Sequence, residues 1–307
     1  MNRRLLMIVN PAAAAGAGKR QWETLLAGLR KRRINADHVL TNHPRHAVTL
    51  AQEAARNYDV IVAVGGDGTV NEVASGLLLA RSPETVLGIV PFGTGNDVAQ
   101  LMGIHDLAGA LAAIEQGRTV TMDAIEVLCH DAGRPVTRHA LLFAAVGFAG
   151  ELLKHTTPAV KRIFGAKYCY SVGFFRALFR YRAPQMKIRC GDQEFQGRMF
   201  LACAGNAEYA GGGVMRLSPG ASISDGLLNV SVIESMDRWE IARNFPRLLR
   251  GTHVGHAKVR YFTATSLAIE TDPVIEIQVD GDLSGYTPAT FQVKPSALKI
   301  LSLRHDL

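Results

Sequence analysis

Short, wholly apolar runs alternate with stretches of helical periodicity over the first part of the chain. A strand buried in a parallel sheet reads as a continuous apolar run, because helices cover both faces of such a sheet. The alternation therefore predicts an α/β domain with a doubly wound parallel sheet in residues 1–125. Its expected strands are 5–9, 36–41, 60–64, 87–91 and 119–124, and its expected helices are 19–30, 47–57, 70–81 and part of 104–116.

The pattern changes after residue 123, where strand-like segments follow one another with few helices between them. This texture predicts an antiparallel, β-rich sandwich as a second domain, residues 126–293. The chain has no flexible linker at this point, so we expect a tight boundary and a ligand site in the cleft between the domains. The expected strands are 126–129, 138–145, 187–189, 199–204, 227–233, 257–261, 266–270, 275–279 and 290–293, and the expected helices lie near 160–181 and 237–250.

Two glycine-rich turns follow predicted strands. Residues 65–69 read GGDGT after the strand 60–64, and residues 92–97 read FGTGND after the strand 87–91. Glycine lets the backbone approach a ligand closely, and the amides at a helix N-terminus attract phosphate. Parallel strands place such turns at one sheet edge, where open α/β sheets bind ligands. The turns predict a nucleotide or phosphate-ester site, with a purely structural strand-to-helix turn as the alternative.

These motifs carry a family resemblance. GGDGTVNEV at residues 65–73 together with PFGTGND at 91–97 resembles the catalytic domain of diacylglycerol kinases, especially the soluble bacterial lipid kinases. GGDGT alone is shared with sphingosine, ceramide and NAD kinases and with phosphofructokinases. The resemblance implies an NAD kinase/phosphofructokinase-like first domain, a lipid-substrate second domain, and a C-terminal tail, 294–307, that returns to the first domain.

The resemblance also implies that ATP is the phosphoryl donor and that the two turns cradle its phosphates. Asn10 opens a loop similar to the family's Asn-Pro-x-x-Gly nucleotide loop, with alanines in place of its usual polar residues. Glu72 falls in the first turn of a predicted helix, where complementing the helix dipole is the alternative role. The expected nucleotide-binding residues are Asn10, Thr41, Gly65, Gly66, Asp67, Gly68, Thr69, Glu72, Thr94 and Gly95.

Carboxylates near the turns supply the oxygen ligands that Mg²⁺ prefers. Asp67, Asp97 and Asp123 each fall at a strand end or turn, and the resemblance implies that they form a network around a hydrated Mg²⁺ on ATP. Capping a helix is the alternative for Asp97. Asp123 has the alternative of simply ending a strand.

The alternating strand 274–279 ends in Asp280-Gly281, a strong hairpin signal. Family members usually carry Asp-Gly-Glu here, and the glutamate is the proposed general base. This chain has Asp282 in its place, with a side chain shorter by one methylene, roughly 1.5 Å. We predict that Asp282 is the catalytic base, with Asp280 as the second candidate and solvated turn aspartates as the alternative.

Residues 217–228 resemble the family signature P-x-A-x-x-x-D-G-x-L. In relatives this aspartate and nearby carbonyls hold a structural divalent ion. The resemblance therefore implies an ion at Asp225, Ser222 and Leu227, with a turn aspartate before a strand as the alternative.

The net charge of +7 comes entirely from residues 151–190, which contain nine basic residues and one acidic residue, while the rest of the chain is nearly neutral. Aromatic residues are interleaved with them, and both Arg176/Arg180 and Phe175/Phe179 have i, i+4 spacing. A helix with this pattern suits an anionic membrane surface, and the lipid-kinase resemblance favours membrane over nucleic acid. A helix packed on the domain core with a solvated basic face is the alternative.

The leading hypothesis is an ATP- and Mg²⁺-dependent kinase acting on a lipid hydroxyl, of diacylglycerol or a related lipid alcohol. An NAD kinase-like enzyme, or a nucleotide- and lipid-binding regulator with little turnover, remain as alternatives. The longest apolar run, 140–150, is shorter than the ~18 residues of a membrane span. The four cysteines have no metal-ligand spacing. We therefore expect a cytoplasmic protein with reduced thiols, in contact with the inner face of the membrane.

Overall fold

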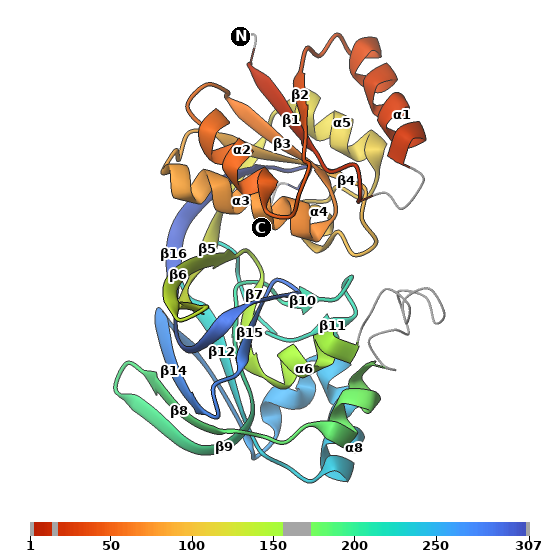
Figure 1. Ribbon diagram of the computed structural model, residues 1–307. Helices are drawn as coiled ribbons and strands as arrows, with labels where there is room; N and C mark the ends of the chain where they lie inside the picture. The colour runs from red at the N-terminus through yellow and green to blue at the C-terminus, as the bar shows by residue number, and fades with distance from the viewer. Residues whose placement is uncertain (1–2, 14–17, 156–172, 305–307) are drawn as a thin grey trace. The chain divides into compact units, whose positions relative to one another are not determined.

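The computed structural model describes residues 3–13, 18–155 and 173–304. The chain divides into unit 1, Met1–Met122 with Ser296–Leu307, and unit 2, Asp123–Pro295 (Figure 1). The polypeptide passes between the units within two long strands, β5 (Thr119–Asp131) and β16 (Asp282–Leu301).

Unit 1 is built on a parallel sheet with the strand order β16-β4-β3-β1-β2. The four consecutive strands lie where the apolar runs predict them, and β1 and β3 are buried along their whole length. The prediction that residues 119–124 form a fifth strand of this sheet was wrong. These residues are the start of β5, which pairs with β16 and β6, and the C-terminal end of β16 lies beside β4 instead. The strands are β1 (Leu5–Val9), β2 (Asp37–Leu40), β3 (Val60–Gly65) and β4 (Val86–Pro91).

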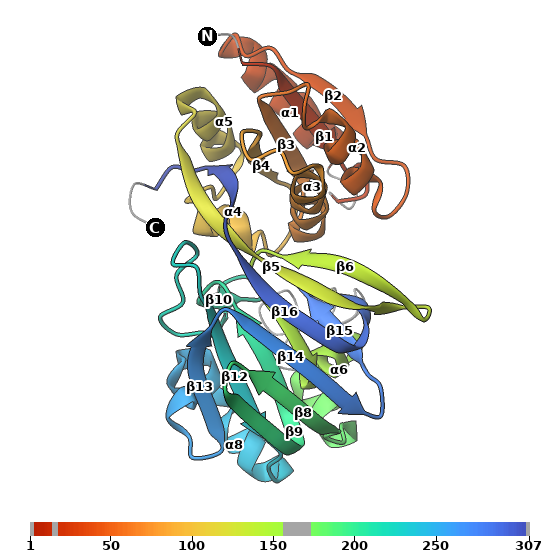
Figure 2. The same cartoon turned by 90° about the vertical axis from the view of Figure 1, so that its left-hand side faces the viewer.

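Helices cover both faces of this sheet, with α2 and α3 on one face and α1 and α5 on the other (Figures 1 and 2). Gly76 of α3 lies against the α2 backbone, and a methyl group there would come within 2.7 Å of the Ala51 side chain. Helix α3 starts three residues before the predicted 70, inside the glycine turn. The helices are α1 (Gly18–Lys31), α2 (His46–Ala54), α3 (Asp67–Ala80), α4 (Asp97–Leu101) and α5 (Leu107–Gln116).

Unit 2 is an antiparallel β-sandwich whose two layers share strands. One layer has the order β13-β12-β9-β7-β15-β16, and the other joins β9, β8, β14 and β16. The first half of β9 pairs with β8 and the second half with β7 and β12, so this strand passes from one layer to the other. The remaining strands are β6 (Arg134–Ala140), β7 (Phe143–Gly147), β8 (Gln185–Cys190), β9 (Gln193–Gly205), β10 (Tyr209–Ala210), β11 (Met215–Arg216), β12 (Leu228–Glu234), β13 (Val259–Ala264), β14 (Ser266–Asp272) and β15 (Glu276–Val279).

The segment predicted as one strand at 138–145 is two strands, β6 and β7, because the chain turns at residues 141 and 142. The following apolar residues form helix α6 (Phe148–His155), which the strand pattern concealed. Lys154 on α6 pairs with Glu276 on β15 at 2.6 Å, and this ion pair holds the helix to the sandwich.

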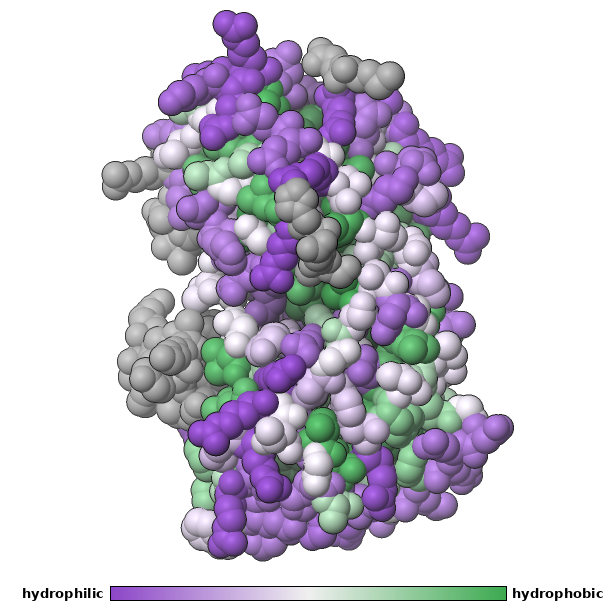
Figure 3. All heavy atoms as spheres, turned by 180° about the vertical axis from the view of Figure 1, so that it is seen from behind, coloured by the Kyte–Doolittle hydropathy of each residue, from purple (hydrophilic) through white to green (hydrophobic). Residues whose placement is uncertain are grey.

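Further helices pack on the outer face of β9, β12 and β13. They are the helical segment 173–180, α8 (Arg238–Arg250) and the short helix η1 (Thr252–Gly255). Phe148, Phe174, Phe200 and Ile241 form an apolar cluster between these helices and the sheet. The first part of the predicted helix 160–181 lies outside the described residues. Seen from behind, apolar side chains of unit 2 reach the surface in patches between polar ones (Figure 3).

No helix in the described ranges is long and apolar enough to cross a membrane. Cys129, Cys190 and Cys203 are free thiols and are all buried. Burial raises the pKa of the Cys203 thiol to about 12.

We predict that Cys203 is protected from alkylation in the folded protein. At pH 8 roughly one thiol in 10⁴ with a pKa near 12 is a thiolate, and the thiolate is the reactive form. Labelling of Cys203 by iodoacetamide, followed by peptide mass spectrometry, should be roughly a thousandfold slower in buffer than in guanidinium chloride. Equal rates in the two solvents would contradict the buried placement.

Candidate active site

The first glycine turn joins β3 to α3 without room for side chains. A Cβ atom on Gly65 would collide with the Thr69 hydroxyl group. Thr69 also accepts a hydrogen bond from the Asn10 side chain at 3.0 Å, and the Asn10 oxygen accepts from the amide of Ala12. The ends of β1 and β3 are thereby joined at the sheet edge where the turn lies.

The carboxylate of Asp67 connects the two glycine turns. Its two oxygens accept hydrogen bonds from the backbone amides of Asn96, at 2.8 Å, and Asp97, at 2.7 Å. The turns also touch directly, since a Cβ atom on Gly93 would lie 2.6 Å from the Gly66 Cα atom. Gly95 is restricted in the same way by the Asp67 carboxylate, 2.7 Å from its ideal Cβ position. One side chain and three glycines thus fix the spacing of the turns.

Asn96 stabilises the second turn from within. It adopts a left-handed conformation, with φ of 53°, which asparagine tolerates better than most residues. Its side-chain oxygen accepts from the Gly93 amide at 3.0 Å, and its side-chain nitrogen donates to the Gly93 carbonyl at 2.8 Å. Gln100 closes the turn from the other side by donating to the Gly95 carbonyl. Thr94 lies in the middle of this turn, which is part of the predicted cradle.

Glu72 caps a neighbouring helix. Its oxygens accept from the amides of Arg45, at 3.0 Å, and Ala47, at 3.3 Å, at the start of α2. Thr41 follows β2, and its amide donates to the Val9 carbonyl at the end of β1. The two acidic residues of α3 therefore cap other helices: Glu72 caps α2, and Asp67 caps α4.

The N-terminus of α3 itself keeps its first amides available. Within the described part of the chain, no acceptor is found for the amides of Asp67, Gly68 and Thr69. Unpaired amides at the start of a helix, together with its dipole, form a binding site for phosphate.

Asp123 belongs to unit 2, whereas Asp67 and Asp97 belong to unit 1. The Asp123 side chain is 1% exposed and accepts from the Gly226 amide at 2.7 Å. Its own amide donates to the Ile223 carbonyl at 2.7 Å. Asn206, fully buried, donates to the carbonyls of Asp123 and Leu141. The sequence pattern gave no sign of this role for Asn206, because both carbonyls that it binds lie more than 60 residues away.

The segment predicted to hold a structural ion forms two small turns. The Asp225 carboxylate accepts from the Leu227 amide at 3.0 Å, and the Ser222 hydroxyl accepts from the Ser224 amide at 3.4 Å. Within the described ranges, no group of three or more His, Cys, Asp or Glu residues gathers as metal ligands would. An ion held by one carboxylate and backbone carbonyls stays a prediction.

The hairpin turn between β15 and β16 separates the two candidate bases. Val279 pairs with Asp282, and the two residues between them have positive φ, 45° at Asp280 and 92° at Gly281. The Asp280 carboxylate accepts from three backbone amides, those of residues 141, 142 and 143, at 2.6–2.9 Å. Asp282 is exposed at the start of β16. Three amides already use the oxygens of Asp280, and the role of Asp282 as the base stays a prediction.

Two turns at the carboxyl ends of neighbouring parallel strands, joined by a carboxylate and opening on a helix N-terminus, define a phosphate-binding α/β protein. Comparison with known proteins agrees. Residues 4–127 match the diacylglycerol kinase catalytic domain, and residues 144–302 match the YegS C-terminal NAD kinase beta sandwich-like domain.

Relatives extend over nearly the whole chain. Diacylglycerol kinases of Staphylococcus aureus and Staphylococcus saprophyticus are 30% and 29% identical over 294 residues, covering 95% of this chain and 90% and 92% of theirs. The chain belongs to the diacylglycerol kinase family, whose members are phosphotransferases.

Solved structures share the fold. A diacylglycerol kinase from Bacillus anthracis superposes with a TM-score of 0.77 at 24% identity, covering 98% of this chain and 97% of its own. The yeast NADH kinase superposes with a TM-score of 0.53 at 11% identity, covering 99% and 84%. The NAD kinase-like architecture is therefore confirmed.

We predict that alanine substitutions at Asp280 and Asp282, two residues apart, have very unequal effects on stability. Asp280→Ala leaves three buried amides without an acceptor and should lower the free energy of unfolding by about 3 kcal/mol or more. Asp282→Ala, at an exposed position, should change it by less than about 1 kcal/mol. Urea titrations followed by circular dichroism measure both, and similar losses would contradict the assignment.

Proposed function

We propose that this protein transfers the γ-phosphoryl group of ATP to the hydroxyl group of a lipid, diacylglycerol or a related lipid alcohol. One observation carries the proposal: the N-terminus of α3 lies at the two glycine turns that Asp67 joins, and its first amides have no acceptor among the described residues. The names of the relatives, diacylglycerol kinase over 95% of the chain, support a lipid acceptor.

The nucleotide phosphates would lie at the two turns of unit 1. The amides of Gly68 and Thr69 would donate to phosphate oxygens. The glycines of the turns have no side chain, so the backbone could approach these oxygens closely. Asn10 and Thr69, already hydrogen-bonded to each other, would border the same site.

The donor set fits Mg²⁺. This ion is usually bound by one or two carboxylates together with substrate phosphates and water. Asp67 and Asp97 would provide these carboxylates, because the two residues are neighbours in the site: the Asp97 backbone amide donates to an Asp67 oxygen at 2.7 Å. When bound, Mg²⁺ would neutralise charge on the phosphates.

Asp282 would act as the general base. Its carboxylate would take the proton of the lipid hydroxyl as the lipid oxygen forms a bond to the γ-phosphorus atom. The bond between that phosphorus and the β–γ bridging oxygen breaks, and ADP leaves.

We predict that Asp282→Asn lowers turnover by about 10²–10⁴-fold, because the amide cannot take the proton. Labelled ATP, Mg²⁺ and diacylglycerol in mixed micelles are incubated with the full chain, and labelled lipid is separated and identified by mass spectrometry. Asp192→Asn removes a charge at an exposed turn and serves as the control. Unchanged turnover in folded Asp282→Asn would refute the assignment.

The same assay separates the alternatives. A total bacterial lipid extract in place of diacylglycerol would reveal a different lipid acceptor. Label on added NAD would establish an NAD kinase-like enzyme. ATP binding with no labelled product would favour a regulator with little turnover, and a gain in turnover in Asp282→Glu would show that the shorter base limits the reaction.

We also predict that Asp67→Asn weakens ATP binding at least tenfold. An asparagine has one acceptor oxygen, so one of the two hydrogen bonds to the second turn is lost and the cradle loosens. Asp106→Asn is the matched control, because Asp106 also accepts from a backbone amide in unit 1, that of Gly109 at 2.8 Å. Isothermal titration with ATP measures the binding. Equal affinities in the two variants would contradict the role of Asp67 in holding the two turns together.

A further inference from the structure

Two neighbouring helical elements of unit 2 expose aromatic side chains on one surface. Phe175 and Phe179 of the segment 173–180 are 41% and 52% exposed, and Trp239 of α8 is 71% exposed. The rings of Phe179 and Trp239 meet edge to face, with centroids 6.3 Å apart. Three large aromatic side chains left in water at one place need a reason, because burying such surface is favourable.

Arginines surround these rings. The segments 173–182 and 237–258 hold only two acidic residues, Asp237 and Glu240. None of the arginines forms an ion pair within the described part of the chain. The arginines at exposed positions are Arg176, Arg180, Arg182, Arg238, Arg243, Arg247 and Arg250. We call this surface, with Phe175, Phe179 and Trp239, the aromatic–arginine face.

Both elements are held firmly from the opposite side. Phe174 packs against Phe245 of α8, with ring centroids 4.2 Å apart, and Ala177 and Leu178 are buried beside them. The alternation of buried and exposed pairs along 174–180 therefore directs Phe175, Arg176, Phe179 and Arg180 outward.

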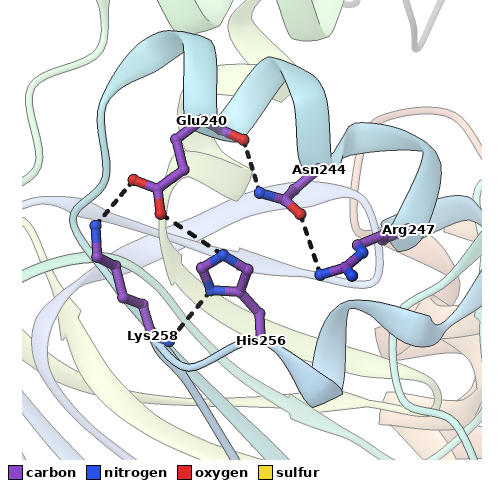
Figure 4. Close-up of polar contacts among 5 residues, drawn as sticks. All are labelled: Glu240, Asn244, Arg247, His256 and Lys258. Carbon is purple, nitrogen blue, oxygen red and sulfur yellow. Dashed lines mark hydrogen bonds and ion pairs between the residues drawn. The ribbon is translucent and has the colours of Figure 1, made fainter.

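A polar network fixes the rotation of α8 (Figure 4). Glu240 accepts from Lys258 at 2.8 Å and lies 3.6 Å from His256, and its carbonyl accepts from Asn244. The hydrogen bond from the Lys258 ammonium lowers the pKa of Glu240. The carboxylate is therefore ionised, and the charge of Lys258 balances it. The face of α8 that carries Trp239, Arg243 and Arg250 is left pointing away from the sandwich.

We propose that the aromatic–arginine face docks on an anionic phospholipid bilayer, with Phe179 and Trp239 entering the headgroup region. Charge complementarity selects this partner, since basic residues near an anionic leaflet are attracted by about 1 kcal/mol each. Tryptophan and phenylalanine beside them are the side chains that settle at a membrane interface. The proposal goes beyond phosphoryl transfer, because a docked surface is independent of the chemistry at the glycine turns.

The chain contains its own reporter. It has two tryptophans, Trp22 and Trp239, so Trp22→Phe leaves Trp239 as the single emitter. This variant is mixed with vesicles of equal phosphatidylglycerol and phosphatidylcholine, without ATP, and compared with pure phosphatidylcholine. We expect emission to move to shorter wavelength, and brominated acyl chains to quench it, with the anionic vesicles only.

The charge requirement is tested in the same background. A triple variant, in which glutamine replaces Arg176, Arg180 and Arg243, should bind the vesicles about 100-fold more weakly at low salt. Each arginine is expected to contribute about 1 kcal/mol. The control, Lys31, Arg56 and Arg134→Gln, removes three exposed positive charges elsewhere and should bind like the parent. In 1 M salt the parent should release from the vesicles, because charges are screened within ~3 Å.

Several outcomes would overturn the proposal. Equal binding by the two triple variants would show that net charge acts without this face. An unmoved Trp239 emission, with circular dichroism showing a folded protein, would exclude insertion. A shift with double-stranded DNA and none with vesicles would assign the face to nucleic acid. Because ATP is absent, a failure here leaves the kinase assay unaffected.

Discussion

The Asp67 carboxylate is the interaction on which the candidate site depends. Its two hydrogen bonds to the amides of Asn96 and Asp97 give α4 the cap that its own N-terminal residue does not supply. A charged acceptor at a helix N-terminus is favourable both as a hydrogen bond and against the dipole. The same contact sets the distance between two turns that belong to different strands. Local helix stability and the shape of the phosphate site therefore come from one side chain.

This arrangement leaves α3 in an unusual position among its neighbours. Glu72 caps α2, Asp67 caps α4, and both acids come from α3. Asp67 lies in the first turn of α3, where its negative charge also complements the dipole of that helix. The amides at its start keep no protein acceptor among the described residues. A helix that caps two others and receives no cap from the described residues is suited to an exchangeable anionic partner, because a permanent cap would have to be displaced first.

The sequence was sufficient to predict an element of the fold where one physical signal dominates. Buried parallel strands such as β1 and β3 are apolar throughout, and the glycine turns mark their ends. It failed where two signals overlap. Residues 140–150 are apolar because they belong to β6, β7 and α6 in turn, so periodicity merged two strands and concealed a helix. The bend between β6 and β7 depends on Asp280, some 140 positions away, which binds the amides of 141–143. A contact of that sequence separation leaves no trace in local pattern. The roles of Asp67 and Glu72 as caps were missed for the same reason: the amides they bind lie 25 to 30 residues away.

The hairpin between β15 and β16 limits how the proposed base, Asp282, could reach an acceptor hydroxyl group. Asp280 is fixed by three amides, and the pairing of Val279 with Asp282 fixes the backbone at the first residue of β16. Asp282 therefore cannot gain the missing methylene length by moving its own backbone without breaking the turn. Either the acceptor hydroxyl approaches closer than it would to a glutamate, or one water carries the proton between them. If the hydroxyl approaches closer, little room is left between it and the base. A longer side chain, such as glutamate, would then crowd the acceptor. The second case makes the site tolerant of a longer base, because the glutamate would simply replace the water.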